Sequence, residues 1–190
     1  MFLKDYIVQF NNFLPLKTVS TLIRFAQTKN FEEAKVGIGE GRVDEKIRKV
    51  GRYVLSPLNK SLSDCHWSRL LEYKINLFIK QYIINKNLIE QFPFGMSINQ
   101  IELLKYKKTN HYKFHIDHAK TLERSLSAVV ILNNDYKGGE LVFKNTINDE
   151  QIKMELIAGS LVVFPSNFLF PHAVKPVTEG IRYSIVAWAC

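Results

Sequence analysis

Cysteine is scarce in this sequence. Only Cys65 and Cys190 occur among 190 residues. Two thiols cannot form the disulfide framework of a small secreted protein, and their spacing does not match that of a metal-binding cysteine cluster. The apolar patches at the N-terminus are broken by polar residues and are not followed by a small-residue cleavage site. We therefore expect two reduced thiols in a cytoplasmic, intracellular protein.

Long apolar runs are absent as well. No uninterrupted stretch approaches the roughly 20 residues that a helix needs to cross a bilayer, so no membrane partner is expected. Internal repeats and low-complexity linkers are also lacking. With 46% hydrophobic and 23% charged residues, the chain is expected to form one soluble domain over residues 1–190 with a single core.

Basic residues exceed acidic ones, giving a formal net charge of +8 and a pI of about 9.4. This excess is compatible with an acidic protein or a nucleic acid as a partner. The lysines and arginines are spread along the sequence, however, with one local cluster at Lys105, Lys107, Lys108 and Lys113. The pattern is typical of a soluble basic surface and does not by itself assign a function.

Two helices are predicted in the first half of the chain. Apolar residues recur at helical spacing between Thr18 and Thr28, and a longer apolar stripe runs from about Ser61 to Leu88. Between them, residues 36–50 are rich in glycine and charge, which predicts a mobile loop that could close over a substrate.

The pattern changes after Pro93, where short runs rich in Val, Ile, Phe and Tyr alternate with turn signals. This arrangement favours an α+β, mainly β fold: a jelly roll, or double-stranded β-helix, at about 93–190, buttressed by a helical N-terminal part at about 1–92. The expected strands are Asn99–Tyr106, Tyr112–Asp117, Ser125–Leu132, Glu140–Lys144, Gln151–Ile157, Leu161–Phe164, His172–Val177 and Ile181–Trp188.

A candidate metal site lies in the triplet His115-Ile116-Asp117. Side chains two apart on a strand point to the same face, so His115 and Asp117 can converge while Ile116 enters the opposite layer. His172 begins a later predicted strand. Two imidazoles and one carboxylate form the facial triad of non-haem iron(II) oxygenases, which leaves coordination positions open for a 2-oxo acid and O₂.

Arg182 follows His172 by ten residues, across the turn Thr178-Glu179-Gly180. Antiparallel strands joined by such a turn bring their residues side by side. A guanidinium pairs bidentately with a carboxylate, so Arg182 suits the distal carboxylate of a dicarboxylic co-substrate. Ser184 lies two residues further, shares a face with Arg182 and can add a hydroxyl group.

Three stretches carry a resemblance to a known family: LLKYKKTNHYKFHID, RSLSAVVILNNDYKGGELVF and AGSLVVFPSNFLFPHAVKPVTEGIRYSIVAW. Together they resemble the catalytic core of the prolyl-4-hydroxylase-like branch of the 2-oxoglutarate/Fe(II) dioxygenase superfamily. The resemblance covers about residues 99–189, and the leading NNFLP and helix at 11–28 are similar to the family's N-terminal entry. The motifs H-x-D, G-G-E-L, F-P-S, H-x-V-x-P-V and G-x-R occur in the family's order.

The resemblance implies that Fe(II), 2-oxoglutarate and O₂ take part, with ascorbate as a possible addition. It implies that His115, Asp117 and His172 bind iron and that Arg182 binds the tail of 2-oxoglutarate. Other residues implied at the site are Tyr106, as a hydrogen-bond donor to 2-oxoglutarate, Tyr112, as an aromatic lining residue, and Arg124, on the substrate side.

The expected activity is hydroxylation of an unactivated C–H bond, with a prolyl residue of a peptide or protein as the leading target and succinate and CO₂ as co-products. Hydroxylation of a free amino acid or other small molecule is the alternative. Nucleic-acid demethylases place a second arginine where this chain has Trp188, which argues against that reading. A jelly-roll binding module without turnover is also disfavoured, because all three ligands and Arg182 are present.

Two departures from the family concern the mouth of the site. Collagen-type prolyl hydroxylases have a lysine at the position of Arg182, so the arginine resembles the oxygen-sensing and bacterial branches. The usual glycine between Tyr106 and Tyr112 is replaced by Lys-Lys-Thr-Asn-His. The sequence therefore leaves the identity of the substrate open.

Overall fold

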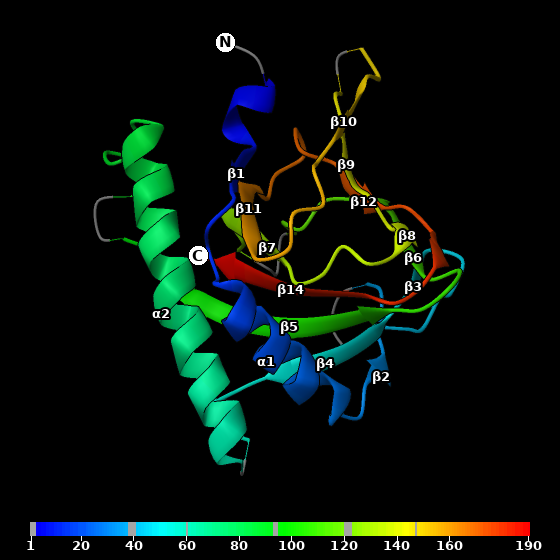
Figure 1. The fold of residues 1–190 in the computed structure, drawn as a ribbon. Helices are drawn as coiled ribbons and strands as arrows, with labels where there is room; N and C mark the ends of the chain where they lie inside the picture. The colour runs from blue at the N-terminus through cyan, green and yellow to red at the C-terminus, as the bar shows by residue number, and fades with distance from the viewer. Residues whose placement is uncertain (1–2, 38–40, 60, 93–94, 120–122, 147) are drawn as a thin grey trace.

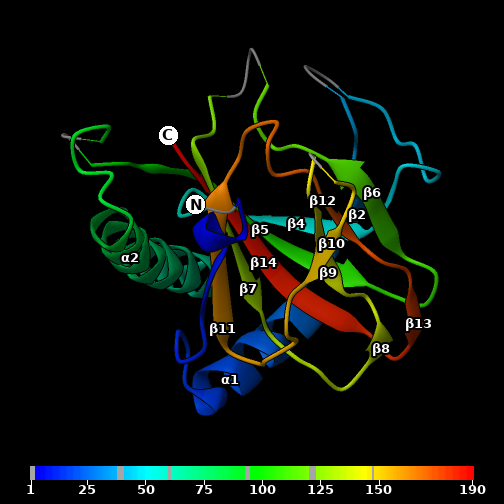
Figure 2. The ribbon, with the colours of Figure 1, turned by 90° about the horizontal axis from the view of Figure 1, so that it is seen from above.

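In the computed structural model, two antiparallel β-sheets face one another and two helices cover the outer face of the larger sheet (Figure 1). The structure describes residues 3–37, 41–59, 61–92, 95–119, 123–146 and 148–190. Seen from above, the smaller sheet lies on the side of the larger sheet that is opposite α1 (Figure 2). This is the layered arrangement of a jelly roll with buttressing helices, as the sequence predicts.

The larger sheet has seven strands in the order β1-β11-β7-β14-β5-β4-β2, and the smaller has five in the order β10-β9-β12-β6-β3. A separate pair, β13-β8, joins two short strands. The larger sheet contains β1 (Val8–Phe10), β2 (Glu32–Glu33), β4 (Gly51–Leu55), β5 (Ile98–Tyr106), β7 (Leu126–Ile131), β11 (Ser160–Pro165) and β14 (Arg182–Ala189). The others are β3 (Arg48–Lys49), β6 (His111–His115), β8 (Lys137–Gly138), β9 (Leu141–Lys144), β10 (Gln151–Lys153), β12 (His172–Val174) and β13 (Val177–Glu179).

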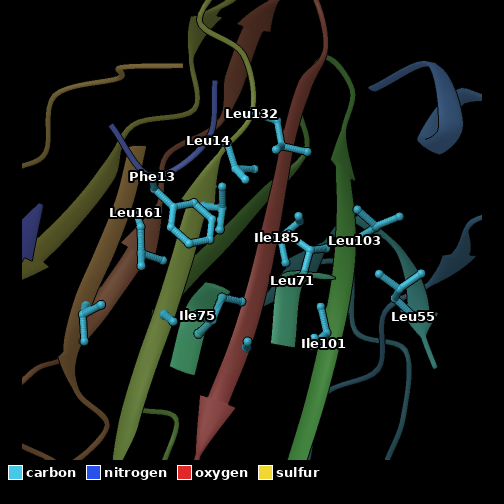
Figure 3. Packing of buried hydrophobic residues seen from close by; sticks show 14 of the residues in the cluster. Phe13, Leu14, Leu55, Leu71, Ile75, Ile101, Leu103, Leu132, Leu161 and Ile185 are labelled. Atoms are coloured by element: carbon cyan, nitrogen blue, oxygen red, sulfur yellow. The ribbon is translucent and has the colours of Figure 1, made fainter. Parts of the chain in front are cut away.

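The larger sheet is apolar on both faces, and the period of two along its strands separates two cores. In β14, Ile185 and Ala187 belong to the core beneath the helices, whereas Val186 and Trp188 belong to the core between the sheets. Figure 3 shows Leu71 and Ile75 of the second helix packed against the first of these faces. The second face is therefore free to carry a site whose walls are both sheets.

The helices are α1 (Leu16–Gln27) and α2 (Leu62–Asn85), preceded by a short 3₁₀ helix, η1 (Leu3–Tyr6). Ser61 is the N-cap of α2 and its hydroxyl accepts a hydrogen bond from the backbone N–H of Asp64. Both α-helices lie within one to three residues of the predicted bounds. Neither of the described helices is long and apolar enough to cross a membrane.

The N-terminal part differs from the helical segment expected for residues 1–92, because it also supplies β1, β2 and β4 to the larger sheet and β3 to the smaller one. Within the predicted loop at 36–50, Val36 pairs with Arg42 and the segment ends in β3. Residues 38–40 of that loop lie outside the described residues. The strand expected at His172–Val177 is two strands, because Pro176 has no N–H to donate between them.

Candidate metal centre and co-substrate pocket

A cavity of about 580 Å³ lies between the two sheets, within the size range of small-molecule sites. The larger sheet supplies alternate residues of β5 and β14 to its wall, and the smaller sheet contributes from β6, β9 and β12. Every site residue proposed from the sequence lines this cavity: His115, Asp117, His172, Arg182, Tyr106, Tyr112, Ser184 and Arg124.

Strand pairing brings the two histidines together. His172, at the start of β12, is the direct partner of His115, at the end of β6. The Nε2 atom of His115 lies 3.5 Å from Oδ1 of Asp117, and Nε2 of His172 lies 3.4 Å from Oδ2 of the same carboxylate. The three ligand atoms lie within 4.8 Å of one another, and theirs is the one such group found among the described residues.

Hydrogen bonds at Nδ1 orient both histidine rings so that their Nε2 atoms face the Asp117 carboxylate. Nδ1 of His115 lies 2.8 Å from the carbonyl oxygen of Lys113, and Nδ1 of His172 lies 3.1 Å from that of Phe170. A carbonyl oxygen only accepts, so each Nδ1 carries the proton and each Nε2 keeps a lone pair for a metal.

The donor set fits a six-coordinate divalent ion. Bonds of about 2.1 Å place neighbouring ligands of an octahedral ion about 3 Å apart, close to the separations found here. Two imidazoles and one carboxylate are the donors typical of an iron(II) facial triad. The residues therefore fit the metal that the sequence implied.

Asp117 reaches the site from a bend, not from a strand. β6 ends at His115, and the Ile116 side chain is 41% exposed rather than buried in the opposite layer, so that part of the strand prediction is wrong. The Asp117 carboxylate is 7% exposed and accepts a hydrogen bond of 2.6 Å from the hydroxyl of Ser127. The Ser127 and Ser166 hydroxyls in turn lie 2.7 Å apart.

Burial sets the protonation of the ligands. Desolvation, reinforced by His115, lowers the pKa of His172 to about 4, so this imidazole is neutral at physiological pH. Burial would raise the pKa of Asp117, but the two histidines and the Ser127 hydroxyl outweigh it and hold that pKa well below its usual range. His172 is therefore a neutral imidazole and Asp117 a carboxylate, the protonation states that a metal requires of these two ligands.

Arg182 is a buried cation without a counter-ion. Its side chain is 1% exposed and its guanidinium stacks 4.9 Å from the ring centroid of Tyr106. Nη1 donates to the Ser184 hydroxyl at 2.6 Å, but neither Nε nor Nη2 has a hydrogen-bond partner among the described residues. A buried guanidinium left in this way is costly unless an anion completes it, so the structure provides a carboxylate-binding group in the same cavity as the triad.

The remaining predicted residues are arranged around these two centres. Tyr112 stacks on the ring of His115 at 3.5 Å between centroids. Ser184 has its hydroxyl engaged by Arg182. Arg124, two residues before β7, places its guanidinium 3.6 Å above the centroid of the Trp188 ring and donates to the carbonyl of Asp117 at 3.5 Å.

The structure adds residues that the sequence analysis missed. Ser127 and Ser166 fix the carboxylate of the triad. The buried hydroxyl of Tyr136 has no hydrogen-bond partner in the described part of the chain, and its ring borders Gly139 together with the Arg182 side chain. Arg48 and Glu102 form a buried pair on the cavity wall. In the sequence, these residues could have been found as polar residues within otherwise apolar strands, as Ser127 and Glu102 are.

Comparison with known proteins agrees with this geometry. Residues 101–190 match the family model described as the 2OG-Fe(II) oxygenase superfamily. These residues belong to that superfamily. The oxygenase segment is also similar to PKHD-type hydroxylases, being 37% identical over 119 residues to one from Prochlorococcus marinus and 40% identical over 85 residues to one from Nitrosomonas eutropha.

The first of these alignments covers 60% of this chain and 52% of the relative, and the second covers 40% and 36%. The chain thus spans about half, or less, of the length of these curated relatives. Among solved structures, the oxygenase fold resembles a Pseudomonas putida prolyl-4-hydroxylase, with 24% identity, a TM-score of 0.68 and coverage of 96% of this chain and 91% of that one.

It also resembles a prolyl hydroxylase from Trichoplax adhaerens solved in complex with a hypoxia-inducible-factor peptide fragment, with 20% identity and a TM-score of 0.73 over 97% of this chain and 83% of that one. At these identities the two structures establish the fold, and the chain has the double-stranded β-helix fold of these prolyl hydroxylases.

Proposed function

We propose that this protein is an Fe(II)- and 2-oxoglutarate-dependent hydroxylase that acts on a prolyl residue of a peptide or protein. The observation that carries the proposal is the presence, in one cavity, of the triad His115, Asp117 and His172 and of the unpaired buried guanidinium of Arg182. A structural metal site would need no second anion-binding group beside it. A co-substrate with a carboxylate at each end needs both.

The chain's residues would hold the two groups as follows. His115, Asp117 and His172 bind the metal through Nε2, a carboxylate oxygen and Nε2. Arg182 binds the far carboxylate of 2-oxoglutarate, oriented by Ser184 and by the ring of Tyr106. When bound together, iron and 2-oxoglutarate supply the oxidising chemistry that inserts one oxygen atom of O₂ into a C–H bond, with succinate and CO₂ as co-products.

Apolar walls limit the access of water to this site. Val129, Leu141 and Val174 line the cavity. Phe143 and Phe164 pack their rings 5.7 and 4.7 Å from the centroid of His172. These ring contacts hold the His172 imidazole in place. They also exclude water from the metal side of the cavity, which strengthens the electrostatic binding of the co-substrate.

A peptide target is supported by the relatives. The similar sequences are named PKHD-type hydroxylases, and one similar structure holds a peptide fragment. A free amino acid or another small molecule is the alternative substrate. A role for ascorbate and a cytoplasmic location stay predictions.

The first experiment is an anaerobic titration of the purified chain with Fe(II) and 2-oxoglutarate, followed by visible absorption. We expect a coloured charge-transfer band that needs both components. Proline-containing peptides and free amino acids are then screened for stimulated succinate release, and mass spectrometry locates the added oxygen. His172→Ala is expected to abolish the band and turnover, whereas Arg182→Gln raises the KM for 2-oxoglutarate about a hundredfold. A wild-type chain that develops no band and consumes no 2-oxoglutarate contradicts the proposal.

A further inference from the structure

The cavity continues beyond the metal centre into a charged outer half. Register along β5 and β14 orders the wall: Tyr106 pairs with Arg182 at the co-substrate end, and Glu102 pairs with Val186 further along the strands. The last pair lining the cavity is Gln100 with Trp188. Polar side chains therefore occupy the end of the cavity that the proposed function leaves for the substrate.

Glu102 is the centre of this outer half. Its side chain is 3% exposed, and its two oxygens lie 3.5 Å from Nη2 of Arg48 and 3.4 Å from Nη1 of Arg52. Gln100 also donates to Oε1 at 2.6 Å. Each oxygen of the carboxylate thus has a guanidinium partner, and Glu102 holds two arginines at the cavity wall.

Two guanidiniums lie on either side of the metal ligands. Arg48 stands 4.7 Å from the ring centroid of Tyr112, which itself stacks on His115. Arg124 is fixed on the other side, between Trp188 and the carbonyl of Asp117. The Nε atoms of both Arg48 and Arg124 are buried without a hydrogen-bond partner among the described residues. Stacking holds each fork in place before any ligand arrives, which reduces the entropic cost of binding.

The charges do not cancel. Arg48, Arg52 and Arg124 carry three positive charges in the outer half, against the single negative charge of Glu102. The rim adds Glu32, Glu33 and Lys35, which are exposed and therefore screened by water and salt. At the co-substrate end, the negative charges of Asp117 and 2-oxoglutarate balance Fe(II) and Arg182. The excess of positive charge is thus confined to the region where the substrate would lie.

Resting on the proposed function, we propose that the outer half of the cavity binds a carboxylate of the substrate between Arg48 and Arg124, so that the preferred peptide carries an acidic group next to the hydroxylated residue. Arg48 also donates from Nη1 to the carbonyl of Lys35 at 3.1 Å, so its Nε and its charge are what it offers a ligand. The binding is that of guanidinium N–H groups donating to a carboxylate, and it is directional because both guanidiniums are fixed by stacking. An uncharged collagen-like repeat would leave the excess positive charge of the outer half uncompensated.

The test measures peptide binding to the chain loaded with Zn(II) and 2-oxoglutarate, which does not turn over. Proline peptides with Asp at each neighbouring position in turn are compared with the matched Asn peptides by calorimetry. We expect peptides with Asp at one or two of these positions to bind at least about tenfold more tightly than the matched Asn peptides. The difference in affinity is expected to decrease as NaCl is added. The carboxylate that binds could also be a main-chain carboxylate. Peptides that end in a free carboxylate at the proline, and N-acetylproline, test this source against an Asp side chain.

Two variants probe the arginines. Arg124→Gln removes one guanidinium. The double variant Arg48→Gln/Glu102→Gln removes the second guanidinium together with its buried partner carboxylate, so that no unpaired charge is left in the wall. Each is expected to reduce the preference for Asp over Asn about tenfold while binding the Asn peptide as the wild type does. Arg69→Gln, an exposed change on α2, is the matched control and is expected to keep the full preference.

Equal binding of Asp and Asn peptides, an unchanged preference in both variants, or failure of every peptide to bind would overturn this inference. The first two results would leave the proposed function intact, because it depends on the separate absorption band of Fe(II) with 2-oxoglutarate and on succinate release. Failure of every peptide to bind would also count against a peptide substrate, but not against the Fe(II) and 2-oxoglutarate chemistry. Loss of that band in the wild type would instead overturn the proposed function itself.

Discussion

At the scale of single residues, the pocket around Arg182 is shaped by glycine. Gly139 adopts a φ of +65°, and a Cβ there would lie 3.1 Å from both the Cδ of Arg182 and the ring of Tyr136. The absence of a side chain lets the arginine and the tyrosine share one buried space. None of the residues that the structure describes forms a hydrogen bond with the Tyr136 hydroxyl. The Tyr136 hydroxyl lies beside the guanidinium proposed to bind the carboxylate of 2-oxoglutarate, so it is suited to donate a hydrogen bond to the same carboxylate.

Tyr136→Phe is therefore expected to weaken the binding of 2-oxoglutarate about tenfold to a hundredfold, the value of one hydrogen bond to a charged group, without affecting metal binding. The KM for 2-oxoglutarate and the metal dissociation constant are the two measurements. Tyr183→Phe provides the control, because Tyr183 faces the core beneath the helices. An unchanged KM in Tyr136→Phe would mean that this hydroxyl takes no part in co-substrate binding.

The protonation of His172 predicts a pH effect on the metal-free protein. Burial lowers its pKa to about 4 from 6.5, so between these values the unfolded chain binds more protons than the folded one. Stability is then lost as the pH falls from about 6.5 towards 4, with about 3 kcal/mol at stake. Asp117, whose folded pKa is also lowered, extends the loss below the ordinary carboxylate pKa.

Urea unfolding in the presence of a chelator, at pH 7 and pH 5, measures this slope. In His172→Gln the loss between the two pH values is expected to be smaller than in the wild type, since glutamine does not titrate. Equal losses in both proteins would show that another group controls the acid sensitivity.

At the scale of elements, β7 connects the metal site to the core of the larger sheet. Ser127 is fully buried in this strand, and its hydroxyl holds the Asp117 carboxylate. Ser127→Ala is expected to weaken metal binding about tenfold or more, because partners that orient a ligand contribute on this scale. Zn(II) affinity by competition with a chelator is the measurement, and Ser127→Thr, which keeps the hydroxyl, is expected to restore most of it.

Ser125→Ala, an exposed change just before β7, serves as the control for this series. The Ser127 result would be contradicted if Ser127→Ala bound Zn(II) as tightly as the wild type. A loss of affinity that Ser127→Thr did not restore would point to packing of the strand rather than to the hydroxyl group.

The same elements show what sequence could and could not predict. The C-terminal strands are apolar runs between clear turn signals, so their positions were predicted to within a few residues, and the period of two placed Arg182 and Ser184 on one face. β2 and β3 are two-residue edge strands made of charged residues, Glu32–Glu33 and Arg48–Lys49. Nothing in their local pattern announces a strand, because pairing with β4 and β6 alone defines them.

For the same reason the site was only partly predictable. The triad and Arg182 are fixed by short spacings within the jelly roll. The pair of Arg48 and Glu102 depends on β3 pairing with β6 and on β5 lying in the other sheet, contacts between residues 54 apart in the sequence. The bend at Asp117 escaped prediction because its position is set by Ser127, a tertiary contact that no strand periodicity reveals.

At the scale of the whole molecule, one sheet serves two purposes on its two faces. Its inner face carries Arg182, Ser184 and the cavity, and its outer face is covered by α2. Since alternate residues of the same strands face each side, the helix supports the backbone from which the site is built. Figure 3 shows Leu71 of α2 beside Ile185 of β14, and Ile75 of the same helix belongs to the same core.

Leu71→Ala, at a fully buried position of α2, is accordingly expected to destabilise the protein by about 2–5 kcal/mol, the cost of removing a buried leucine side chain and leaving a cavity. Leu77→Ala on the same helix, where the leucine is 46% exposed, is expected to cost less than about 1 kcal/mol. Chemical denaturation measures both. Because the two faces share a backbone but no side chains, the folded fraction of Leu71→Ala is expected to keep its metal affinity. A variant as stable as the wild type would show that α2 does not buttress the sheet, and a folded variant that had lost the metal would show that the two faces are not independent.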